Sequence, residues 1–148
     1  MYSFDSFRPE HISSLRVEDT TLLAPVTSYP KIIEVYAEHP SFTLFYNGRF
    51  LFCGGAVIPW KGFGEVWMLV GDESLAPHAW AALKYSRLAA KIIHQHFGVE
   101  RLQTPVCVDY PKWKRFAEAC GFKSEGLMKH YGPDGNDYFM MSRTEWDR

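Results

Sequence analysis

Three cysteines are among the residues of this sequence that could do chemistry. Cys107 is followed two positions later by Asp109, and a cysteine thiolate is a competent nucleophile when a nearby histidine accepts its proton. Nothing in the spacing assigns such a histidine to Cys107. Cys53 and Cys120 lie far from it in the sequence, and no C-x-x-C pair exists. We therefore expect all three thiols to be reduced and buried, as free cysteines usually are.

Two histidines, His94 and His96, form an H-x-H pattern near the end of a predicted helix. Residues two positions apart do not share a helical face, and a zinc site needs three or four converging ligands. Because the sequence indicates no third ligand, we expect no metal site here.

Length and composition predict one globular domain over residues 1–148. The chain is 47% hydrophobic and 16% aromatic, which is enough for a substantial core. The net charge of −1 argues against general nucleic-acid binding and gives no reason to expect a membrane surface as partner. No apolar run reaches about 18 residues, and the first residues lack a signal-peptide pattern, so we expect a cytoplasmic protein.

Local signals predict helices followed by a hairpin in the first part of the chain. Residues 9–39 are typical of mostly helical structure, with a clearer helix over 29–38 that Ser28 could cap. Asn47-Gly48 is a strong hairpin signal within 41–58, because both turn positions need positive φ. Gly54-Gly55 predicts a bulge after the second strand of this hairpin.

A strand, a long helix and a second strand are predicted next. Residues 63–70 are apolar on both faces, which is typical of a central strand. The helix spans 77–97 and ends at Gly98, and the strand over 102–108 then lies parallel to the first one. Because Pro105 cannot donate to a ladder, we expect one edge of this strand to be unpaired near its middle.

A short helix over 112–120, ended by Gly121, and a hairpin formed by 122–131 and 137–143 complete the chain. The order is two helices, three antiparallel strands, a helix, a strand, a helix and a hairpin. Such a succession predicts an α/β fold with a mixed sheet.

The C-terminal stretch resembles the GCN5-related N-acetyltransferase (GNAT) superfamily. Members commonly have a helix, then Gly-Phe, a strand reading small-Glu-Gly, and a hairpin that ends in an apolar strand. The segments that match this plan are Gly121-Phe122, Glu125-Gly126 and Tyr138–Ser142. The resemblance covers roughly residues 28–143 by this ordering of elements. It implies a GNAT-like mixed, mostly antiparallel sheet flanked by helices, with a splayed central parallel strand pair.

The resemblance also implies acetyl-coenzyme A or another acyl-coenzyme A as co-substrate, bound where the parallel strands splay apart. The backbone positions that it assigns to the pantetheine arm are Met68, Leu69 and Val70. The pyrophosphate would lie at the start of the long helix. The family's glycine-containing loop is replaced there by 71–79, which contains two carboxylates and a proline. The side chains that could bind phosphate instead are Ser74, His78 and Lys84, although a lysine stripe such as the one that contains Lys84 is usually the solvated face of a helix.

Two catalytic positions follow from the same resemblance. The family's general base is often a Glu on the fourth strand, and Glu65 occupies that strand here, where a solvated carboxylate beside Lys61 is the alternative. The family's general acid is often a Tyr four residues before Gly-Phe, but this position is Ala117. Tyr110 is our substitute for it and Tyr131 is the other nearby phenol, with simple aromatic packing as the alternative.

Two functions are therefore expected to compete. The first is acyl-coenzyme A-dependent N-acyl transfer to an amine of a small molecule or a protein. The second arises because the stretch 65–90 is similar to a small group of GNAT-like proteins of tailed bacteriophages. In this second function, the chain is a catalytically degenerate protein that binds a host or virion protein in the bacterial host cytoplasm. Trp60, Trp67 and Trp80 surround the expected cleft, and we expect two of them to be core residues and the third to be a lid or a binding hot spot.

Overall fold

The computed structural model describes residues 1–12, 20–22, 31–71, 76–133 and 135–147. Its strands are β1 (Tyr2–Ser6), β2 (Thr20–Leu22), β3 (Ser41–Tyr46), β4 (Arg49–Trp60), β5 (Phe63–Gly71), β6 (Arg101–Cys107), β7 (Lys123–Met128) and β8 (Tyr138–Arg143). Its helices are α1 (Lys31–Ala37), α2 (Ala79–Phe97) and α3 (Pro111–Ala119), with 3₁₀ turns at Pro9–His11 and Ala76–His78. No helix in these ranges is both long and apolar enough to cross a membrane.

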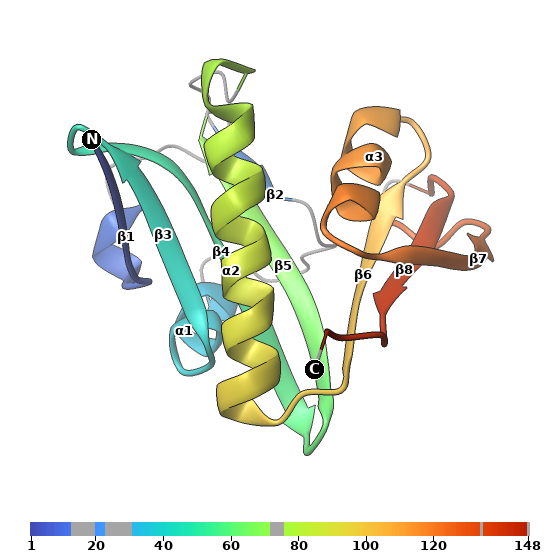
Figure 1. Ribbon diagram of the computed structural model, residues 1–148. Helices are drawn as coiled ribbons and strands as arrows, with labels where there is room; N and C mark the ends of the chain where they lie inside the picture. Colours follow the sequence, from blue (N-terminus) through green and yellow to red (C-terminus); the bar gives the residue numbers. More distant parts are fainter. Residues whose placement is uncertain (13–19, 23–30, 72–75, 134, 148) are drawn as a thin grey trace.

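The strands form one mixed sheet in the order β1-β3-β4-β5-β6-β8-β7, and β2 is added on β5. Neighbours are antiparallel except for β5 and β6, which are the parallel pair. α2 and α3 cover one face of the sheet (Figure 1), where Met68 and Val70 pack against α2. α1 covers the other face through Ile33 and Tyr36. The expected mixed sheet flanked by helices is therefore confirmed.

The hairpin of β3 and β4 turns at the predicted residues, because Asn47 and Gly48 adopt φ values of 50° and 78°. The bulge expected at Gly54-Gly55 is wrong, since both glycines pair in register with β5. Glycine is needed at position 55 because of a close approach. A Cβ there would lie 2.2 Å from the carbonyl oxygen of Pro40.

The parallel strands β5 and β6 pair only where they begin. Their register pairs are Phe63–Arg101, Gly64–Leu102 and Glu65–Gln103. Beyond Gln103, β6 keeps β8 on one edge and has no strand partner on the other among the described residues. Pro105 lies in this stretch, as the sequence predicted, and Figure 1 shows β5 and β6 diverging there. The expected splay of the central pair is confirmed.

The crossover helix α2 ends as predicted, with Gly98 at a φ of 66°. It begins at Ala79 rather than Pro77, because Ala76–His78 forms a 3₁₀ turn instead of the first helical turn. Its inward side chains are small near the start, where Ala81 and Ala82 are buried, and larger at Ile93. This taper leaves space between α2 and the diverging strands.

The N-terminal region differs from the expectation of a mostly helical segment over 9–39. The described part contains only the turn at Pro9–His11 and the seven-residue α1 as helix, and it includes the strand β2. Ser28 lies outside the described residues. The sequence also did not reveal β1, which pairs along its whole length with β3. β1 and β2 form because they pair with strands distant in the sequence, and local propensity does not predict such pairing.

Candidate functional site

The divergence of β5 and β6 opens a cavity of about 830 Å³ that α2 and α3 enclose. Its lining is mostly apolar and includes Met68, Val70, Ala82, Ser86, Val106 and Phe116. The cavity exists because β6 leaves β5 after the Glu65–Gln103 pair and because α2 presents small side chains to the gap. A space of this size and character fits a small-molecule ligand.

The main-chain edge of β5 that faces this gap is only partly open. β2 pairs antiparallel with β5 and matches Thr20 to Gly71, Thr21 to Val70 and Leu22 to Leu69. Since β4 already occupies the other edge of β5, β2 lies on the edge that faces β6. Met68 lies in the stretch that pairs with neither β2 nor β6 among the described residues. Leu69 and Val70, in contrast, are already paired, and their role in binding a ligand stays a prediction.

The start of α2 holds two of the side chains that the sequence suggested for phosphate. The Nδ1 atom of His78 is hydrogen-bonded to the hydroxyl of Tyr2 at 2.8 Å, and its ring lies 4.7 Å from that of Tyr46. Lys84 lies over the rings of Trp80 and Tyr85. His78 and Lys84 thus contact aromatic residues outside the cavity lining, on the side of α2 near β1. Ser74, the third candidate, lies outside the described residues.

Tyr110 lies at the mouth of the cavity. It occupies the N-cap position of α3 without a side-chain capping hydrogen bond, lines the cavity and is 57% exposed. Ala117, at the position where the sequence resemblance leads one to expect a tyrosine, is buried in the same lining, and its side chain carries no proton donor. Cys107 also lines the cavity, and it is buried and free like Cys53 and Cys120. Burial raises the pKa of the Cys120 thiol to about 11, so Cys120 itself is a poor nucleophile at neutral pH.

Glu65 lies at the point where the strands part, but its side chain belongs to a second, more open groove. This groove is lined by Trp60, Lys61, Gly62, Phe63, Glu65, Arg101 and Gln103. The described hydrogen-bond partner of Glu65 is Gln103, whose Nε2 donates to Oε1 at 2.8 Å. Glu65 and Tyr110 therefore do not share one cavity. Tyr110 lines the cavity, and Glu65 lines the open groove.

The negative charge of Glu65 contributes to raised pKa values of two tyrosines. Burial, followed by the charges of Cys53 and Glu65, raises the pKa of Tyr36 to about 12. Burial and then Glu65 also raise the pKa of Tyr131. The sequence suggested Tyr131 only as a second phenol. The charge of Glu65 acts on its hydroxyl, and Tyr131 does not line the cavity that Tyr110 lines.

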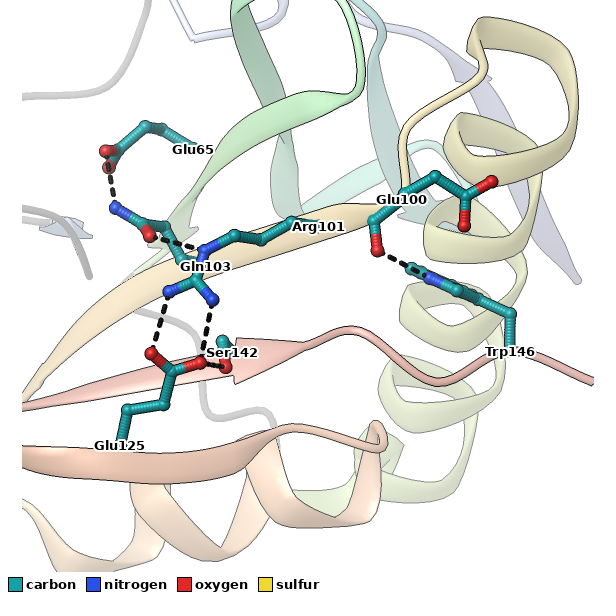
Figure 2. A network of polar contacts seen from close by, with 7 residues as sticks. All are labelled: Glu65, Glu100, Arg101, Gln103, Glu125, Ser142 and Trp146. Carbon is teal, nitrogen blue, oxygen red and sulfur yellow. Dashed lines mark hydrogen bonds and ion pairs between the residues drawn. The ribbon is translucent and has the colours of Figure 1, made fainter.

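A polar network around Glu65 is the part of the site that sequence reasoning missed. Figure 2 shows Glu65, Gln103, Arg101, Glu125 and Ser142 joined by hydrogen bonds and an ion pair. The alternation along β6 was the available signal. Leu102 is in the core while Arg101 and Gln103 lie on the other face, but their partners depend on strands far away in sequence.

The indole side chains divide differently from the expectation. Only Trp67 is a core residue, at 2% exposure, and it stacks on Tyr36 with ring centroids 3.9 Å apart. Trp60 and Trp80 are 65% and 74% exposed. The prediction that two of the three are core residues is therefore wrong, because Trp60 lies at a hairpin end and Trp80 on the outer side of the first turn of α2.

Comparisons with known proteins agree on the fold. Models of known protein families give no match to the sequence, and no curated protein matches it. The structure is similar to Ard1 from Thermoplasma volcanium, with a TM-score of 0.74, 13% identity and 99% of each chain covered. It is also similar to the ribosomal-protein-S18-alanine N-acetyltransferase from Escherichia coli, with a TM-score of 0.73, 16% identity, and 100% and 97% coverage. A GNAT-family acetyltransferase from Bacillus anthracis gives 0.64 at 12% identity, over 77% and 71% of the two chains. The chain thus has the GNAT fold.

Proposed function

We propose that this protein is an N-acyltransferase. It would move an acetyl or other acyl group from a coenzyme A thioester to the primary amine of a small molecule or a protein. The observation that supports this most is the parting of β5 and β6 after the Glu65–Gln103 pair, beside a cavity of about 830 Å³. The N-acetyltransferases to which the fold is similar support the same reaction class.

The pantetheine end of coenzyme A fits the residues present. The cavity lining is apolar, Ala82 and Ser86 leave room on α2, and the main chain of Met68 is available on the facing edge of β5. We assign the arm to the backbone of Met68, and to Leu69 and Val70 once β2 leaves that edge. For the diphosphate we assign Ser74 together with His78 and Lys84, whose side chains would have to turn from their present aromatic partners.

The bound thioester would supply an activated acyl group, and the protein's own groups would handle the protons. Glu65 would take a proton from the acceptor amine as its nitrogen bonds to the acyl carbon. A main-chain N–H of β5 would polarise the carbonyl. As the carbon–sulfur bond breaks, the Tyr110 hydroxyl would protonate the departing thiolate. The acceptor would approach from the groove that holds Glu65 and the thioester from the other side of the gap.

Calorimetric titration with coenzyme A tests the proposal. Micromolar binding supports it, and no heat at millimolar ligand contradicts it. Ser86→Phe, which fills the cavity, should abolish binding. Leu88→Phe is the matched control, because Leu88 is exposed on α2 and does not line the cavity.

A second candidate function is the binding of a partner protein, which would be a host or virion protein if a phage encodes this chain. The exposure of Trp60 and Trp80 favours it, since exposed tryptophans are frequent binding hot spots. Loss of a captured partner on Trp60→Ala or Trp80→Ala, with no coenzyme A binding by the unaltered protein, would favour this function over acyl transfer.

A further inference from the structure

The polar network beside the sheet gap gives Glu65 a fixed direction. We propose that Gln103 is a positioning residue that holds the Glu65 carboxylate at the gap, and that Arg101 fixes which way the Gln103 amide points. The inference rests on the proposed function, in which Glu65 is the general base.

The contact between Glu65 and Gln103 is built into the sheet. The two residues form the last register pair of β5 and β6 before the strands part. Gln103 Nε2 donates to Glu65 Oε1 at 2.8 Å. Among the described residues, Oε2 of Glu65 has no hydrogen-bond partner, and in the proposed reaction it is this oxygen that accepts the proton. A carboxylate held through one oxygen with the other free is suited to general-base work.

The direction of the Gln103 amide is set by Arg101. A glutamine amide can present either its oxygen or its NH₂ group to a neighbour, and only the NH₂ group can bind a carboxylate. Arg101 Nε donates to Gln103 Oε1 at 3.0 Å. Because a guanidinium has no acceptor, the amide oxygen must face Arg101 and the NH₂ group must face Glu65. Flipping the amide would break both contacts.

Arg101 is held in turn by Glu125 on β7. Its Nη1 and Nη2 atoms donate to the two carboxylate oxygens at 2.7 and 3.0 Å, a bidentate geometry that favours arginine over lysine. The hydroxyl of Ser142 donates to the same carboxylate. These bonds, first that of Arg101 and then that of Ser142, lower the pKa of Glu125 to about 2. Glu125 is therefore charged throughout the neutral range.

A β-bulge aims Glu125 at Arg101. In the pairing of β7 with β8, Ser124 is opposite Met141 and the next pair is Gly126 with Met140. Glu125 has no partner in this register and is the extra residue of the bulge. Bulges redirect side chains in this way. The bulge accounts for the Glu-Gly pair in the C-terminal motif, because Gly126 adopts a φ of 149°. The network consequently spans β5, β6, β8 and β7 (Figure 2) and ends at the proposed base.

Kinetic cycles test the inference. Glu65→Gln should lower kcat for acetyl transfer about 100-fold, the usual scale of general-base catalysis. Gln103→Met and Arg101→Met should each lower kcat about tenfold at unchanged KM for acetyl-coenzyme A, because misplacing a catalytic group costs rate rather than binding. The losses in kcat from Gln103→Met and Arg101→Met should not add up in the double variant. In the Glu65→Gln background, Gln103→Met should have no further effect. Gln95→Met, an exposed position on α2, is the matched control.

The contrary outcomes are distinct. Equal losses from Gln103→Met with and without the Glu65 carboxylate would overturn the positioning role and leave acyl transfer intact. Full kcat in Glu65→Gln would overturn both the base assignment and the positioning role. Absence of coenzyme A binding would overturn the proposed function itself.

A spectroscopic measurement tests the contact between Gln103 and Glu65 without an activity assay. In ¹⁵N NMR spectra, Glu65→Gln should move the signal of the Gln103 side-chain amide, because the substitution removes the carboxylate that the NH₂ group binds. Arg101→Met should also move this signal while the backbone spectrum stays folded. An amide signal insensitive to both substitutions would overturn the inference even if every variant were inactive.

Discussion

If the pantetheine arm of coenzyme A binds along Leu69 and Val70, we expect it to displace the strand β2 from that edge of β5. β2 pairs with that edge of β5 through only three residues, with Thr21 opposite Val70. A ligand that needs the same main-chain groups competes with β2, so its apparent affinity is reduced by the fraction of molecules in which β2 is detached. Weakening β2 should therefore tighten binding.

Thr21→Pro is the perturbation of choice. Proline cannot donate a backbone hydrogen bond and holds φ near −65°, so it should remove one or two of the contacts that β2 makes. Each contributes about 1 kcal/mol net, so the detached fraction, and with it the affinity for coenzyme A, should rise about 5-fold to 30-fold. Isothermal titration calorimetry measures this change.

Ser3→Pro is the matched control, because it makes the same change in the edge strand β1, far from the gap. Hydrogen exchange gives a second readout, since the amides of Thr20–Leu22 should lose protection when coenzyme A binds. The reasoning is refuted if Thr21→Pro leaves the affinity unchanged or weaker while the control binds like the unaltered protein. Binding would then be confined to the stretch of β5 around Met68.

Three further outcomes are expected. Tyr110→Phe should lower kcat about 10-fold to 100-fold with little change in KM, measured by steady-state acetyl transfer; an equal rate would exclude Tyr110 as the acid. Gly55→Ala should destabilise the protein by about 1–3 kcal/mol in urea unfolding, because its Cβ would overlap the Pro40 carbonyl; native stability would refute the close approach. The folded pKa of Glu125, about 2, lies below its ordinary value of 4.5, so its clamp on Arg101 stabilises the fold above pH 4.5 and is lost as the pH falls through about 2. Glu125→Gln should flatten that part of the acid-unfolding curve, and an unchanged curve would contradict the assignment.

Several parts of the site were predictable because their signals are local. Pro105 indicated an unpaired edge, and that edge borders the cavity. The strand that carries Glu65 was recognisable from its apolar run and its place before the long helix. The neighbours of Glu65 were not predictable in the same way. Gln103 and Glu125 are 38 and 60 positions away, and only strand register and a bulge bring the network together.

The sequence by itself determined the turn at Asn47-Gly48 and the helix ends at Gly98 and Gly121. These are set by the φ preferences of single residues, which act in any surroundings. Only the tertiary structure decided that β2 covers part of the β5 edge, that His78 bonds to Tyr2, and that the proposed base lines the open groove rather than the cavity. Such features depend on which distant segments share an edge or a face, and a register change of one residue would send every side chain of a strand to the opposite side.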